Sequence, residues 1–172
     1  MAEWGFFQDR HVELIDGVIF DMSPQSSLHA NTVMRCIRAL DRAFGSTATL
    51  RTQANLRMGS SDPEPDVCVL TLADTEAPLP PTTALLVVEV SLTTLAYDRG
   101  AKASLYAAAG IADYWIANLH NNTLEVRREP RPDAAARFGH SYGQLMTVTP
   151  AETVSPLARP DANIAVRDFF AK

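Results

Sequence analysis

The sequence predicts a mixed fold of the α/β or α+β class, in which helices pack on a β-sheet. Three observations predict it. Short apolar runs of strand-like composition outnumber helical patterns, two helical patterns stand between groups of these runs, and no regular strand–helix alternation continues along the chain. The length of 172 residues fits one domain over residues 1–172, and a content of 47% hydrophobic residues can build a sizeable core.

The first predicted element is a β-hairpin over residues 12–22. The stretch VELIDGVIFDM holds two apolar runs joined at Asp16 and Gly17, a dipeptide suited to a tight turn. An amphipathic helix is predicted next, over residues 28–44, because apolar residues recur there at spacings of four, three and four. These residues are Val33, Ile37, Leu40 and Phe44. A serine before the helix caps it and a glycine after it ends it.

Three strands are predicted in the middle of the chain, over residues 47–58, 66–72 and 84–91. The first alternates loosely, and the other two are short apolar runs. Each of these two follows a loop, GSSDPEP or APLPPTT, because prolines continue neither a helix nor a central strand. A second helix is predicted over residues 97–109, and Gly110 ends it.

The last part of the chain is predicted to contain a second hairpin, formed by residues 113–118 and 123–129. The stretch PRPDAAARFGH, residues 130–140, has the composition of a surface loop. A strand near residues 144–148 and a short element ending in DFF complete the chain. We therefore expect helices packed on a mixed sheet that carries N-terminal and C-terminal hairpins.

The charge balance argues against a general electrostatic attraction to nucleic acid. The formal net charge is −5 and the isoelectric point about 5.3, whereas such proteins normally carry a basic patch and a high isoelectric point. A group of arginines opposes this balance, and it is either a solvated helix face and strand edge or a local binding patch. The group consists of Arg35, Arg38, Arg42, Arg51 and Arg57.

The cysteines and the apolar runs bear on location. Cys36 and Cys68 form no CxxC pair and have no histidine at metal-binding spacing, which predicts two reduced, buried thiols in a reducing cytoplasm. The N-terminal stretch MAEWGFFQDRH lacks the apolar core of a signal peptide. No apolar run approaches the ~20 residues of a membrane span. We therefore expect a cytoplasmic protein with no membrane partner.

Three ionisable residues stand where the pattern predicts an apolar environment. Asp66 opens a buried strand, Glu89 lies within LLVVEV, and Lys102 lies early in the second helix. A carboxylate removed from water destabilises the fold unless it is paired, protonated or bound to a metal. Two acids on neighbouring strands can share one hard cation such as Mg²⁺ or Mn²⁺. The three residues are therefore candidates for a metal-dependent site.

Each of the three also has an explanation without chemistry. Asp66 can bond backbone amides at the start of a strand, and Glu89 can belong to a half-exposed edge strand. Lys102 stands four residues after Asp98, so an exposed ion pair worth only ~0.3 kcal/mol is open as well. A glycosidase that uses the two acids as acid and nucleophile is less favoured, because it leaves Lys102 unexplained and the chain shows no aromatic platform for sugar rings.

Several motifs together resemble the Uma-type putative restriction endonuclease family, which belongs to the PD-(D/E)XK nuclease superfamily. The motifs are ELIDG at 13–17, PQSSLHA at 24–30, EPDV at 64–67, VVEVS at 87–91, YDRGAK at 97–102 and LYAAAGIADYWIAN at 105–118. Their order also matches, and the resemblance runs from about residue 12 to residue 129. It implies a restriction-endonuclease-like sheet flanked by helices.

The resemblance implies roles for the three candidates. Asp66 is similar to the aspartate of the PD motif and Glu89 to the acid of the (D/E)XK motif, and both would bind the catalytic metal. The sequence departs from the superfamily signature two residues after Glu89, where Ser91 stands in place of lysine. The resemblance places the catalytic lysine in the following helix instead, at Lys102.

Three further residues are site candidates. Glu13 matches an early glutamate of the family, which implies another metal ligand or a group that holds water. His29 matches a histidine of the family, and its place in the first helical turn favours a neutral ring that accepts a proton. A capping or packing role for His29 is also open. Gln53 is a weaker candidate for positioning the metal shell or the lysine.

The resemblance further implies an endonuclease that hydrolyses phosphodiester bonds in nucleic acid, with DNA as the expected substrate and Mg²⁺ or Mn²⁺ as cofactor. The alternative is a catalytically inactive module with the nuclease fold that binds nucleic acid or a protein. Nucleases that cut two strands often pair two subunits, which implies a homodimer. Its interface is the apolar stretch Tyr114, Trp115 and Ile116, or these residues are core.

Overall fold

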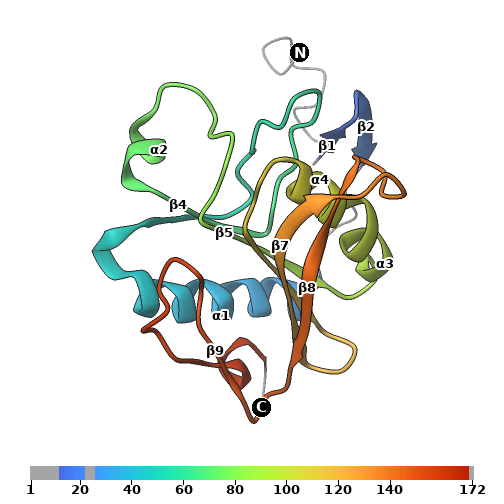
Figure 1. Cartoon of the computed structure of the whole chain (residues 1–172). Coiled ribbons are helices and arrows are strands. Elements are labelled where there is room, and N and C mark those ends of the chain that lie inside the picture. Colours follow the sequence, from blue (N-terminus) through green and yellow to red (C-terminus); the bar gives the residue numbers. More distant parts are fainter. Residues whose placement is uncertain (1–11, 22–25, 171–172) are drawn as a thin grey trace.

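The computed structural model describes residues 12–21 and 26–170 (Figure 1). The main sheet contains β3 (Thr49–Arg51), β4 (Val67–Leu70), β5 (Leu86–Ser91), β6 (Asp113–Asn118), β7 (Thr123–Pro132) and β8 (His140–Val148). These strands lie in sequence order across the sheet, and all neighbours are antiparallel except the parallel pair β5 and β6. Two short antiparallel pairs complete the strands: β1 (Val12–Ile15) with β2 (Val18–Asp21), and β9 (Thr153–Val154) with β10 (Ile164–Ala165). The predicted mixed sheet is confirmed.

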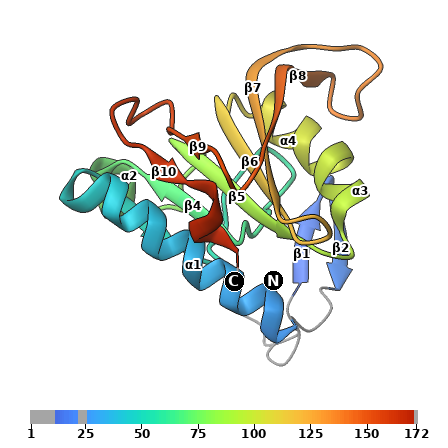
Figure 2. The same cartoon turned by 90° about the horizontal axis from the view of Figure 1, so that it is seen from below.

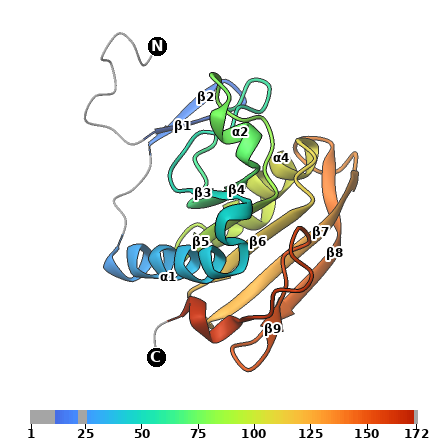
Figure 3. The same cartoon turned by 90° about the vertical axis from the view of Figure 1, so that its left-hand side faces the viewer.

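Helices lie on both faces of this sheet. They are α1 (Ser27–Phe44), α2 (Leu72–Glu76), α3 (Leu95–Tyr97) and α4 (Ala103–Ala108), with a π-helical turn over Asp98–Lys102 and 3-10 turns over Gly45–Thr47 and Val166–Phe169. Figure 2 shows α1 on one side of β5 and the α3–α4 segment on the other. In Figure 3 the β1–β2 hairpin lies above the edge that carries β3, and α1 lies below it.

Strand residues alternate between two hydrophobic clusters, one on each face. In β5, Val88 and Val90 belong to the cluster that contains residues of α1, whereas Val87 belongs to the cluster that contains residues of α4. Because both faces are covered, all six residues of β5 are buried. The same alternation places Glu89 on the face of Val87, toward α4.

The N-terminal hairpin and the first helix form as predicted. Asp16 and Gly17 both adopt positive φ angles, 54° and 74°, which a tight hairpin turn requires. Helix α1 begins after Ser26, whose hydroxyl accepts a hydrogen bond from the His29 N–H at 3.2 Å, and it ends at Gly45. Residue 22, at the end of the predicted hairpin, and residues 24 and 25, at the start of the PQSSLHA motif, lie outside the described part of the chain.

Several predicted boundaries are wrong. The loop predicted over residues 130–140 is shorter and covers residues 133–139, because β7 continues to Pro132 and pairs there with His140 at the start of β8. This part of β7 extends beyond its pairing with β6, so its prolines need not donate to a second neighbour. The strand predicted over residues 66–72 ends earlier, because the Thr71 hydroxyl caps the short helix α2.

The strand predicted over residues 47–58 is regular only over β3. The following residues hydrogen-bond instead to the proline-rich stretch before β4, through Gln53 N–H to Pro65 O at 3.1 Å and Leu56 N–H to Pro63 O at 3.0 Å. The second helix begins at Leu95 rather than at residue 97, and it contains the π-helical turn that the pattern does not predict.

Burial bears on two of the predictions, for the cysteines and for the apolar stretch of the second hairpin. Cys36 and Cys68 are buried and free, as predicted. Tyr114, Trp115 and Ile116 are fully buried within the chain, so they are core residues and not an interface with a second subunit. In the part of the chain that the structure describes, no helix has the length and apolar character needed to cross a membrane.

Candidate active site

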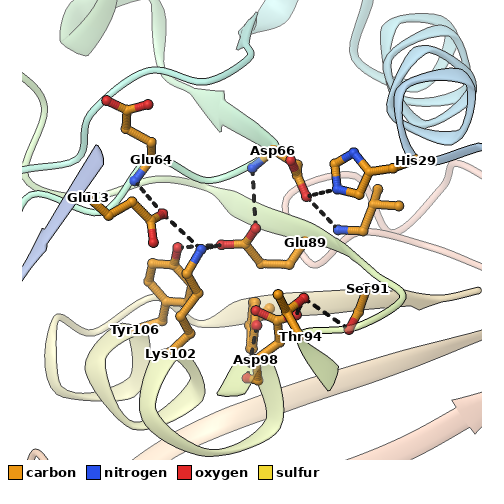
Figure 4. Close-up of polar contacts among 12 residues, drawn as sticks. Glu13, His29, Glu64, Asp66, Glu89, Ser91, Thr94, Asp98, Lys102 and Tyr106 are labelled. Carbon is orange, nitrogen blue, oxygen red and sulfur yellow. Dashed lines mark hydrogen bonds and ion pairs between the residues drawn. The ribbon is translucent and has the colours of Figure 1, made fainter. Parts of the chain in front are cut away.

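The five predicted site residues come together from five separate elements (Figure 4). Glu13 lies on β1, His29 in the first turn of α1, Asp66 directly before β4, Glu89 on β5, and Lys102 at the end of the π-helical turn. The outermost two, Glu13 and Lys102, are 89 positions apart in the sequence and form an ion pair. The fold therefore assembles the group that the sequence motifs suggest, whereas the side chain of Gln53 is exposed.

Strand register brings the two candidate metal ligands side by side. Val67 pairs with Val88 across the antiparallel strands β4 and β5, so Asp66 stands beside Glu89. The backbone N–H of Asp66 points to Glu89 Oε2 at 3.4 Å, and Asp66 Oδ2 accepts a hydrogen bond from the Val90 N–H at 2.8 Å. The pairing of the two strands therefore fixes both carboxylates relative to each other.

Glu89 is almost completely buried and receives two strong donors on one oxygen. Lys102 Nζ lies 2.9 Å from Glu89 Oε1, and the Tyr106 hydroxyl donates to the same atom at 2.7 Å. Burial raises the pKa of Glu89 to about 8, although the charge of Lys102 opposes this shift. The half-exposed edge position considered for Glu89 is therefore wrong.

Lys102 bridges two glutamates in the interior. Its ammonium group contacts Glu13 Oε1 at 2.8 Å as well as Glu89, and its side chain is only 3% exposed. Burial lowers the pKa of Lys102, but the charges of Glu89 and Glu13 outweigh this effect and raise it. The exposed pair with Asp98 is not formed, because the Asp98 carboxylate accepts instead from the Thr94 hydroxyl at 2.6 Å.

The π-helical turn lies between Asp98 and Lys102. The N–H of Ala103 reaches back to the Asp98 carbonyl, which also accepts a hydrogen bond from the Tyr114 hydroxyl at 3.0 Å. Single π-helical turns inside α-helices often occur at functional sites. This turn buries both Asp98 and Lys102, and burial raises the pKa of the Asp98 carboxyl.

His29 connects the first helix to Asp66. Its Nε2 lies 3.1 Å from Asp66 Oδ2, and the side chains of His29 and Asp66 remain 16% and 12% exposed. Burial lowers the pKa of His29, but the hydrogen bond and charge of Asp66 outweigh this effect and raise it. Asp66 therefore favours the protonated ring, opposite to the neutral ring predicted from the helix N-terminus. Solvent reaches the group of five at this end.

Two residues of the group were missed by sequence reasoning. Tyr106 contacts Glu89 directly, and Asp98 adds a fourth buried carboxyl to those of Glu13, Asp66 and Glu89. The signal for Tyr106 was available, because it stands four positions after Lys102 in a predicted helix and therefore on the same face. Asp98 was considered only as an exposed partner.

The carboxylate oxygens of this group are the candidate ligands for a divalent metal ion. Within residues 12–21 and 26–170, no three histidine, cysteine or acidic side chains are arranged to hold a metal ion together. Glu13 faces Lys102 and the Glu64 N–H, at 3.0 Å, rather than Asp66. Asp66 and Glu89 nevertheless fit a hard cation, because they lie side by side and both offer oxygen donors. Among the described residues, the four buried carboxyls of this group have Lys102 and His29 as cationic partners.

A separate hollow of about 460 Å³ lies between residues 51–57 and the proline-rich stretch 77–81. Its wall includes Arg51 and Arg57 from the arginine group, together with Asp62, which lies 3.7 Å from Arg57. None of the five predicted site residues lines it. The hollow and the buried polar group are therefore distinct features.

Comparison with known proteins agrees with the fold and with the motifs. The chain is similar to a crystal structure of a putative nuclease belonging to DUF820 from Anabaena variabilis, with a TM-score of 0.71, 13% sequence identity, and coverage of 92% of this chain and 89% of that one. No curated protein matches the sequence significantly. The model of the Uma2 family, described as putative restriction endonuclease, matches residues 2–161. The chain therefore belongs to the Uma2 family of putative restriction endonucleases.

Proposed function

We propose that the protein is a metal-dependent endonuclease that hydrolyses phosphodiester bonds in DNA. The observation that carries the proposal is the buried Lys102 ammonium group beside Glu89, which is itself adjacent to Asp66. A family membership that implies a nuclease supports the reaction class. Asp66 and Glu89 would hold Mg²⁺ or Mn²⁺, and the bound ion would supply activation of the attacking water and neutralisation of phosphate charge.

The remaining residues act around this pair. Lys102 keeps its proton between two glutamates, so it supplies a fixed positive charge that stabilises the developing charge on the phosphate or orients the attacking water. Glu13 holds the ammonium group from the other side, a position that favours a role in orienting Lys102 over direct metal binding. His29 hydrogen-bonds Asp66 where solvent enters, so it orients that carboxylate and takes up or releases a proton there.

Nicking of supercoiled DNA with Mg²⁺ or Mn²⁺ tests the proposal. We expect wild type to nick the plasmid, EDTA to stop the reaction, and Glu89→Ala and Lys102→Ala each to lose it while circular dichroism shows folded protein. Cleavage that survives both substitutions would remove these residues from the active site. Binding of DNA without metal-dependent cleavage by wild type would favour the inactive, nucleic-acid-binding module instead.

Two further features belong to the proposal. A cytoplasmic location is supported by Cys36 and Cys68, which are free and buried on separate elements. A homodimer is expected by analogy with nucleases that cut two strands, and its interface lies outside the buried Tyr114–Ile116 stretch. Light scattering of the purified protein measures its oligomeric state directly.

A further inference from the structure

Three buried tyrosines, Tyr106, Tyr114 and Tyr142, form a row of neighbouring rings that begins at Glu89. The rings of Tyr106 and Tyr114 lie 5.0 Å apart, and those of Tyr114 and Tyr142 lie 6.0 Å apart, measured between centroids. All three hydroxyls donate hydrogen bonds, to Glu89 Oε1 from Tyr106, to Asp98 O from Tyr114 and to Ile111 O from Tyr142. Of these three hydroxyls, that of Tyr106 alone reaches a carboxylate.

The contacts of Glu89 distinguish its two oxygens. Oε1 accepts from both Tyr106 and Lys102, at 2.7 and 2.9 Å, whereas Oε2 faces the backbone N–H of Asp66 at the longer distance of 3.4 Å. Both donors to Oε1 come from one helical segment, in which Lys102 and Tyr106 stand four positions apart on the same face. The carboxylate is therefore oriented with Oε1 toward α4 and Oε2 toward Asp66.

Lys102 alone does not fix this orientation. Its ammonium group is a compact charge with rotatable donors, and Glu13 shares it with Glu89. Tyr106 has a single O–H donor, and its ring is fully buried and packed against Tyr114. A directional O–H donor on a fixed ring therefore determines which way the carboxylate turns.

We propose that Tyr106 is a positioning residue. Its hydroxyl holds Glu89 Oε1, so that Oε2 faces the place beside Asp66 where the metal ion would bind. The inference rests on the proposed function, in which Asp66 and Glu89 hold the cation. Removal of a group that hydrogen-bonds a metal ligand commonly weakens metal affinity by about 10–100-fold. Removal of the Tyr106 hydroxyl should therefore weaken binding of the metal without removing any group that touches it.

The row of tyrosines also supplies a matched control. Tyr106→Phe removes the hydroxyl that donates to Glu89, and Tyr142→Phe removes a buried hydroxyl of the same row that donates to a backbone carbonyl. Isothermal titration with Mn²⁺ compares the two variants with wild type. Crystal structures of both variants without metal show the position of the Glu89 carboxylate, independently of any activity.

We expect Mn²⁺ to bind Tyr106→Phe at least about 10-fold more weakly than wild type and to bind Tyr142→Phe as it binds wild type. In metal-free Tyr106→Phe, the Glu89 carboxylate should leave the position in which Oε2 faces the Asp66 N–H. Equal Mn²⁺ affinity of Tyr106→Phe and wild type, or an unchanged Glu89 carboxylate, would overturn the inference. A wild type that binds no Mn²⁺ contradicts the metal site of the proposed function, and the crystal comparison still decides the role of Tyr106.

Discussion

Replacement of Lys102 by methionine tests the buried ion-pair network most severely. The substitution keeps an unbranched side chain as far as Cε but removes the charged group that faces Glu13 and Glu89, both of which are buried. Breaking a buried pair from one side typically costs about 3–5 kcal/mol, because the remaining charge loses its partner in a poorly hydrated site. We therefore expect the free energy of unfolding of Lys102→Met to fall by about that amount. Urea denaturation followed by circular dichroism measures it.

Arg99→Met is the matched control, because Arg99 lies in the same π-helical turn and also pairs with a glutamate. Its side chain is 47% exposed and contacts Glu125 at 2.6 Å, so we expect a loss of about 1 kcal/mol or less. Adding Glu13→Gln to Lys102→Met should restore part of the lost stability, because it removes one of the two unpaired carboxylates. Equal losses for Lys102→Met and Arg99→Met would refute the buried network.

Three other predictions concern the metal, the first helix and the thiols. At 100 times its dissociation constant, Mn²⁺ should stabilise wild type by about 2.7 kcal/mol, and thermal denaturation of Asp66→Asn should show no such gain. Ser26→Ala should cost about 1 kcal/mol in the same measurement, because it removes the cap on the His29 N–H; an unchanged stability would contradict the capping contact. Burial raises the pKa of the Cys68 thiol to about 11 and that of Cys36 further, so both thiols should react with a thiol reagent at pH 8 only after unfolding.

The parts of the site that sequence could predict are those with a local signature. Glu89 stands out because a charged residue interrupts an apolar run, and Asp66 because it opens one. The ion pair between Glu13 and Lys102 has no local signature, since 89 positions separate the two residues and β1 belongs to a hairpin outside the main sheet. The resemblance to a family places both residues in one site, but it does not pair them.

The misjudged features depend on tertiary context. The π-helical turn at Asp98–Lys102 has no periodicity that distinguishes it from the α-helix around it, so its burial of both ionisable residues was not predicted. The prediction for His29 considers its helix alone, but Asp66, 37 positions away, raises the pKa of His29 by its hydrogen bond and charge. The ends of β7 and β8 that lie within residues 130–140 are predicted as loop, because composition does not show that the prolines of β7 face an unpaired side.

The rate at which Glu89→Gln nicks supercoiled DNA in Mn²⁺ tests the central claim most directly. The substitution preserves the size of the buried side chain and removes its negative charge, and Glu125→Gln makes the same change on β7 next to Arg99. We predict that wild type and Glu125→Gln nick DNA at similar rates, and that Glu89→Gln is slower by about 100-fold or more. Nicking by Glu89→Gln at the wild-type rate would contradict the assignment of this site as a nuclease active centre.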